Sequence, residues 1–108
     1  MTEEVANLLK NENVNINETD DKGLTGLHLA CLNGNFGIVI LLVVNNANLE
    51  LKAIGILTPL SVACWKGHFE IAKYLITKGN YDKKDLEEDL AYADKNHTEI
   101  IEFLKSQM

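Results

Sequence analysis

The sequence has no arginine, one proline, two cysteines and no long hydrophobic run, and its formal net charge is −6. Proteins that bind nucleic acid neutralise phosphates with a basic face, for which arginine is well suited. We therefore expect no nucleic-acid partner. The longest apolar run, 38–44, is much shorter than the roughly 18 residues of a membrane-spanning helix. The acidic start, MTEEVANLLK, lacks the basic segment of a signal peptide. The sequence predicts an intracellular, cytoplasmic protein that does not contact a membrane.

Motifs for catalysis and for metal binding are missing as well. There is no Cys-x-x-Cys or His-Glu-x-x-His pair, which would bring metal ligands together on one or two turns. A phosphate-binding glycine loop and a nucleophile elbow are also absent. We therefore predict no catalytic residue, no metal site and no cofactor, and we do not expect an enzyme.

What the sequence does contain is an internal repeat. A shift of 33 residues superposes residues 58–79, TPLSVACWKGHFEIAKYLITKG, on residues 25–46, TGLHLACLNGNFGIVILLVVNN. Each copy reads as two short helices separated by a glycine. A chain of 108 residues with 46% hydrophobic residues fits one folded domain built from such units.

The residues that flank the two predicted helices of the second copy are typical of helix ends. Thr58 suits the cap of a first helix, and Pro59 suits its first position, where a missing N–H costs nothing. Gly67 is predicted to end this helix in the left-handed conformation, which residues with a Cβ avoid. Gly79 is predicted to end the second helix in the same way. Its counterparts in earlier units are asparagines, the next best residues for that conformation: Asn46 and Asn13.

The Thr58-Pro59-Leu60 start, the alanine three residues later, the Gly67-His68 pair and the leucine-containing close before a glycine resemble the ankyrin repeat, whose period is also 33 residues. The resemblance covers 20–80 and weakens at both ends. It implies an all-α solenoid of stacked helix-turn-helix repeats with short hairpin fingers. We expect one domain, 1–108, with about three and a half repeats: a half repeat 1–19, full repeats 20–52 and 53–85, and a polar, degenerate capping repeat 86–108.

The histidines and cysteines recur with the repeat. In ankyrin repeats a histidine at the position of His28 bonds the threonine hydroxyl and nearby backbone, so the resemblance implies a structural role; repeat three has Ser61 there. The other two histidines, His68 and His97, both fall at the start of second helices. Cysteines occupy one slot of successive repeats at positions 31 and 64. Since adjacent helices pack about 8 to 10 Å apart, wider than a disulfide spans, we expect two buried, reduced thiols.

Ankyrin domains generally bind proteins through the concave surface formed by fingers and first helices, and the resemblance implies the same non-catalytic recognition here. We expect Trp65 to be the main anchor because aromatic side chains dominate interfaces. The other interpretation is that Trp65 lies flat against its neighbours and closes the stack. The candidate contact residues are Asp21, Lys22, Leu24, Leu32, Asn33, Ile54, Ile56, Leu57, Trp65 and Lys66.

A second surface supports an alternative function, structural self-association. The outward positions of second helices are polar in three units, but in the second unit they are Gly37, Ile40 and Val44. An apolar stripe of this kind can mark a contact between copies. The half repeat also lacks a first helix before Val5, which would leave Leu8 or Leu9 partly uncovered. We expect a monomer in preference to a homodimer, and a protein partner whose identity the sequence does not give.

Overall fold

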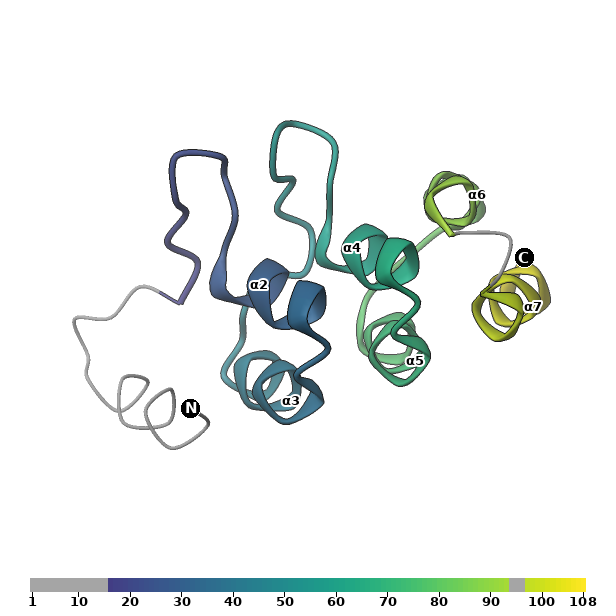
Figure 1. Cartoon of the computed structure of the whole chain (residues 1–108), viewed down its shortest axis with the longest axis horizontal. Helices are drawn as coiled ribbons and strands as arrows, with labels where there is room; N and C mark the ends of the chain where they lie inside the picture. Colours follow the sequence, from purple (N-terminus) through teal and green to yellow (C-terminus); the bar gives the residue numbers. More distant parts are fainter. Residues whose placement is uncertain (1–15, 94–96) are drawn as a thin grey trace.

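The computed structural model describes residues 16–93 and 97–108. The expectations for Leu8, Leu9 and Asn13 in the N-terminal half repeat concern residues outside these ranges. With the labels of Figure 1, the described helices are α2 (Gly26–Asn33), α3 (Phe36–Val44), α4 (Pro59–Lys66), α5 (Phe69–Lys78), α6 (Lys83–Tyr92) and α7 (Thr98–Gln107).

The helices form a stack of pairs. The first helices pack side by side, α2 on α4 and α4 on α6, and the second helices continue the stack through contacts of α3 with α5 and of α5 with α7. In Figure 1 two hairpin fingers project on the side of α2 and α4 that faces away from α3 and α5. The expected all-α solenoid with hairpin fingers is thus confirmed. The boundary expected between residues 85 and 86 falls inside α6, so the last helix pair starts earlier than we expected.

Local chemistry sets where the first helices begin and end. Thr25 and Thr58 each accept a hydrogen bond from the N–H of the third helical residue, whose side chain in turn accepts from the N–H of the threonine. Gly34 and Gly67 end α2 and α4 with φ of 70° and 77°. Pro59 fills the first position of α4, as predicted.

The prediction for Gly79 is wrong. This residue ends α5 in an extended conformation, with φ −89° and ψ 175°, whereas its counterpart Asn46 does have a positive φ of 68°. Gly79 is suited to its place for another reason: a Cβ there would overlap the ring of Tyr81. The close approach of that ring, and not the sign of φ, explains why a glycine stands here.

Two histidines connect successive repeats. His68 caps α5 and lies over Gly34, where an added Cβ would stand 2.7 Å from the ring. Its Nε2–H donates to the Leu32 carbonyl at 3.3 Å. His97 caps α7 and covers Gly67 in the same way. The repeated histidine and glycine therefore form one inter-repeat contact, which occurs twice.

The core lies between the rows of first and second helices. Its fully buried side chains include Leu27, Leu60 and Leu104, one from each of three successive units. Cys31 and Cys64 are also buried, and neither forms a disulfide, as predicted. Burial raises the pKa of the Cys31 thiol to about 12 and raises the pKa of Cys64 as well.

Candidate protein-binding surface

The first finger is a tight turn closed around one glycine. Asp20 N–H donates to the Leu24 carbonyl at 3.0 Å, and Gly23 N–H donates to the Asp20 carbonyl at 3.0 Å. Gly23 carries the positive φ of this finger, 81°. The Asp20 carboxylate accepts the N–H groups of Leu24 and Lys22 at 2.9 Å each, and these bonds lower its pKa. Asp21 and Lys22 are exposed at the tip.

The second finger has the same closing bonds but a different turn. Ala53 N–H donates to the Leu57 carbonyl at 2.7 Å, and Ile56 N–H donates to the Ala53 carbonyl at 3.1 Å. Here two residues have positive φ, Ile54 at 56° and Gly55 at 77°. Positive φ at both central residues is the signature of a type I′ turn, which prefers asparagine and glycine. The glycine stands one position earlier than in the first finger, and an isoleucine takes the other left-handed place.

The fingers are joined to each other. Ile54 N–H donates to the Lys22 carbonyl at 2.9 Å. A Cβ on Gly23 would lie 3.4 Å from the Cα of Ala53, so the two backbones are in contact. Ala53 is completely buried. These contacts hold the base of the second finger against the first finger.

His28 attaches the base of the second finger to α2. Its Nδ1 accepts the Thr25 N–H at 3.1 Å and the Thr25 hydroxyl at 2.8 Å. Its Nε2–H donates to the Leu57 carbonyl in the next repeat at 2.8 Å. These partners fix the ring tautomer. The structural role implied for His28 by the family is confirmed.

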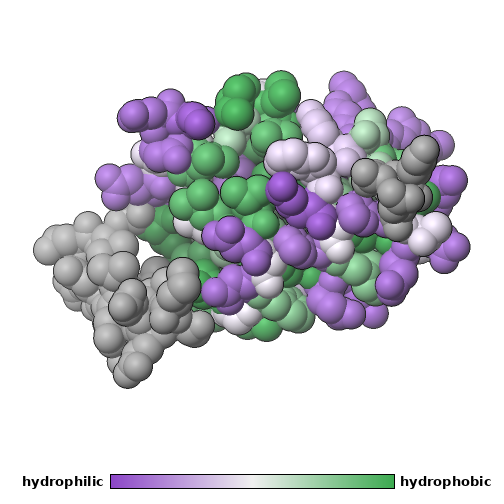
Figure 2. All heavy atoms as spheres, viewed as in Figure 1, coloured by the Kyte–Doolittle hydropathy of each residue, from purple (hydrophilic) through white to green (hydrophobic). Residues whose placement is uncertain are grey.

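The predicted contact residues differ in accessibility. Ile54, Ile56 and Trp65 are 63%, 59% and 49% exposed. Figure 2 shows hydrophobic surface over the second finger at the top of the view, next to hydrophilic surface over the first finger. Asn33 and Lys66 are exposed, whereas three leucines are half-buried: Leu24, Leu32 and Leu57. Leu32 and Leu57 pack against the core, so they offer a partner less area than the sequence suggested.

Trp65 lies near the C-terminal end of α4. About half of the side chain is covered by its own protein, and the other half is open. The Lys66 ammonium lies 4.3 Å from the ring centroid, a cation–π distance. The surface beside the fingers thus presents an aromatic face next to a positive charge.

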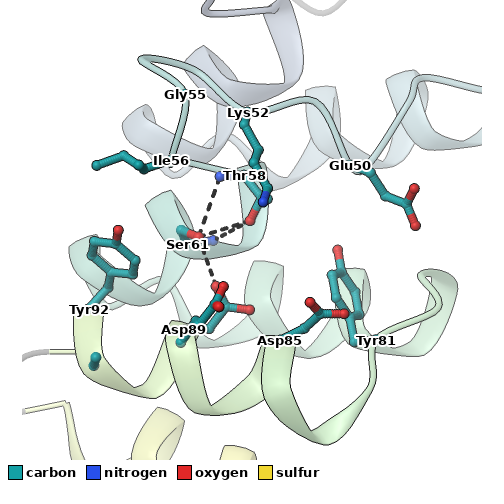
Figure 3. A pocket seen from close by; sticks show the side chains of 12 residues that line it. Glu50, Lys52, Gly55, Ile56, Thr58, Ser61, Tyr81, Asp85, Asp89 and Tyr92 are labelled. Atoms are coloured by element: carbon teal, nitrogen blue, oxygen red, sulfur yellow. Dashed lines mark hydrogen bonds between the residues drawn. The ribbon is translucent and has the colours of Figure 1, made fainter.

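A cleft that sequence reasoning missed lies between the second finger and α6 (Figure 3). Its volume is about 730 Å³, and Ile56, Thr58 and Ser61 line it from the side of the finger and α4. Among the described residues that line it, acidic side chains outnumber the single amine of Lys52: Glu50, Asp85, Glu88 and Asp89. The cleft marks the place where the 33-residue period breaks and no third finger follows.

Asp89 forms the floor of this cleft. It is only 4% exposed, and its carboxylate accepts a 2.8 Å bond from the Ser61 hydroxyl. Burial raises its pKa to about 6; the bond from Ser61 opposes this shift, and the charges of Asp85 and Glu88 add to it. Nearby, the buried hydroxyl of Tyr81 has no hydrogen-bond partner among the residues that the structure describes, and burial raises its pKa. The sequence signal that could have found Asp89 was an aspartate three positions after the apolar Leu86, a spacing that places both residues on one face of a helix.

A second missed residue is Leu29 at the end of the described stack. It is 41% exposed, whereas Val62, 33 residues later, is 3% exposed. α4 packs between α2 and α6, whereas α2 is the first helix that the structure describes. The place of Leu29 on the first helix of the first full repeat was the available signal in the sequence.

The apolar stripe on α3 lies in the other row of helices. Gly37, Ile40 and Val44 are exposed, as are their polar counterparts Glu70, Lys73 and Thr77 on α5. Figure 1 places α3 on the far side of α2 from the fingers. The stripe and the fingers are therefore separate surfaces.

No group of three or more metal-ligating side chains comes together within residues 16–93 and 97–108. Over the same part of the chain, no helix has the length and apolar character needed to cross a membrane.

Comparison with known proteins identifies the family. The family model for ankyrin repeats in three copies matches residues 1–87. Human protein phosphatase 1 regulatory subunit 27 is 34% identical over an alignment of 108 positions, which covers 95% of this chain and 69% of that protein. The human Notch-regulated ankyrin repeat-containing protein is 36% identical over an alignment of 83 positions, which covers 74% of this chain and 73% of that protein. The Drosophila melanogaster ankyrin repeat and KH domain-containing protein mask is 38% identical over an alignment of 89 positions, which covers 77% of this chain and 2% of that protein. The chain belongs to the ankyrin repeat family.

Proposed function

We propose that this protein is a non-catalytic recognition module that binds a protein partner through the surface made by its two fingers and first helices. The observation that carries the proposal is the exposure of Ile54, Ile56 and Trp65 on a rigid scaffold. Exposed apolar side chains of this size on one preformed surface are typical of the buried centre of an interface.

The other candidate residues fit the periphery of such an interface. Half-buried leucines would form its floor, and exposed polar side chains would form its rim: Asp21, Lys22, Asn33 and Lys66. A rim of this kind contributes more to specificity and to association rate than to affinity. We propose that the protein resides inside the cell, because free, reduced thiols are typical of proteins in that compartment.

A pull-down tests the proposal. Wild-type chain, Trp65→Ala and the control Lys73→Ala, which changes an exposed residue of α5, are immobilised and exposed to lysate of the source cells. We expect one protein, identified by mass spectrometry, to be retained by the wild type and the control and to be lost with Trp65→Ala. Equal retention by all three baits would exclude this surface as the binding site.

The relatives suggest one defined candidate partner. Because one of them is named as a regulatory subunit of protein phosphatase 1, we propose the catalytic subunit of protein phosphatase 1 as the first purified protein to titrate against this chain. A relative of similar identity is named only as Notch-regulated, and the ankyrin scaffold does not select a partner by itself. No binding by the catalytic subunit would reject this candidate and leave the proposed surface to the pull-down.

The second candidate function is self-association through the α3 stripe. It is favoured by the exposure of Ile40 and Val44 where α5 and α7 carry polar residues. Sedimentation velocity over a range of concentrations tests it. A dimer that Ile40→Lys abolishes and Lys73→Ala preserves would support this function, and a monomer at all concentrations would exclude it.

A further inference from the structure

Ile54 has a backbone conformation that is unfavourable for its side chain. Its φ is 56°, in the left-handed region. A residue branched at Cβ is rarely found there, because the Cβ crowds its own backbone. Asparagine, aspartate and glycine occupy the same turn position at little cost. The second finger thus has at its tip one of the residue types that are least suited to a positive φ.

The fold does not require an isoleucine at this position. The first finger closes with the same pair of backbone bonds while only Gly23 has a positive φ. The side chain of Ile54 does not fill the core, since most of it is exposed. The bond to the Lys22 carbonyl uses the Ile54 main-chain N–H, which any residue except proline supplies. Neither packing nor hydrogen bonding within this protein explains the residue.

The tip is both apolar and held in place. Ile56, two residues on, is also largely exposed, and Gly55 between them has no atom within 4 Å of an added Cβ. The contact between Gly23 and Ala53 and the bond from Ile54 to Lys22 brace the finger from one side. A braced tip loses little conformational entropy on binding, which favours affinity.

We propose that Ile54 and Ile56 form a rigid apolar wedge that inserts into an apolar recess of the protein partner, and that Ile54 keeps its unfavourable conformation for this contact. The inference rests on the proposed function, since it requires a partner on this face. The recess must be lined by aliphatic or aromatic groups, because neither wedge side chain can satisfy a polar group that binding removes from water.

Stability of the isolated full chain gives the first part of the test. Ile54→Asn places a preferred residue in the turn, so we expect the folding equilibrium constant from urea denaturation to rise roughly five- to thirtyfold. Ile56→Asn is the matched control: it removes an equally exposed isoleucine from a position without a positive φ. Its stability should stay close to that of the wild type. No gain for Ile54→Asn over this control would overturn the inference.

Binding gives the second part. The protein retained by the wild-type chain in the pull-down is purified and titrated against each variant. Both substitutions should weaken binding by roughly tenfold or more, since each removes a buried aliphatic side chain from the interface. Unchanged affinity in both, with loss of binding in Trp65→Ala, would reject the wedge and keep the proposed function. Retention of no protein by the wild type would reject both.

Discussion

The Asp89 carboxylate on α6 accepts a 2.8 Å hydrogen bond from the Ser61 hydroxyl on α4 (Figure 3). One repeat earlier the same position is His28, whose ring reaches the next repeat's Leu57 carbonyl without help. Serine is shorter, and the acidic side chain of Asp89, on the first helix of the next repeat, completes the connection instead. A hydrogen bond thus connects adjacent repeats in both places: a histidine donates it in one, and a serine donates it to an aspartate in the other.

The buried Asp89 carboxylate in this connection makes the stability of the protein depend on pH. The Asp89 pKa is raised from the usual 3.8 to about 6, so the folded state holds its proton at a higher pH than the unfolded state does. The favourable contribution of the protonated form is present below about pH 4 and is lost as the pH rises to about 6. We expect the free energy of unfolding to fall across this window.

Asp89→Asn tests that prediction. The amide cannot ionise, and its oxygen can still accept the Ser61 hydroxyl. At about pH 7.5 we expect the variant to be more stable than the wild type by about 1 to 2 kcal/mol, less than the full shift implies because the cleft admits solvent. The difference should vanish near about pH 4, and Asp85→Asn at the exposed rim should have a smaller effect. Urea denaturation at several pH values measures it; a less stable Asp89→Asn at about pH 7.5 would contradict the assignment.

The histidine–glycine contact between repeats can be separated from backbone strain. Gly67 and Gly55 have the same φ of 77°, but a Cβ on Gly67 meets the His97 ring while a Cβ on Gly55 meets nothing within 4 Å. Alanine at either position pays the left-handed cost of about 1 to 2 kcal/mol. Gly67→Ala should lose about 1 to 3 kcal/mol more, because it also overpacks the contact. Equal losses in urea denaturation would mean that His97 does not hold the repeats together.

The thiols should be unreactive while the protein is folded. Cys31 and Cys64 are buried, and burial raises the pKa of both thiols, so the reactive thiolate is scarce. A thiol reagent such as Ellman's reagent should label neither cysteine in buffer at about pH 8 and both in concentrated urea. Rapid labelling of one thiol in the folded protein would show that the stack opens locally at that repeat.

Much of the fold could be predicted because its signals are local. Thr58 and Pro59 set the start of α4 and Gly67 its end through interactions within a few residues. Gly79 was predicted wrongly because its role depends on the ring of Tyr81 and not on its own φ. The 33-residue period predicted the stack of helix pairs, but it did not show that the ring two residues after Gly79 would lie against it.

The candidate surface was predicted less completely. Leu32 and Leu57 occupy variable repeat positions, yet packing against the core covers part of each. Asp89 was not predicted, since its role depends on which helix packs beside α4 and on the serine that stands in place of a histidine there. The displaced Gly55 was visible in the sequence, but the strain that it leaves on Ile54 required the turn geometry.

Amide hydrogen exchange of the full chain, with and without the partner found by pull-down, tests the central claim most directly. Binding through the fingers and first helices predicts slower exchange at 53–57 and around Trp65, with α3 unchanged around Ile40 and Val44. Protection confined to α3, with free exchange at the second finger, would contradict the account and place the partner on the opposite row of helices.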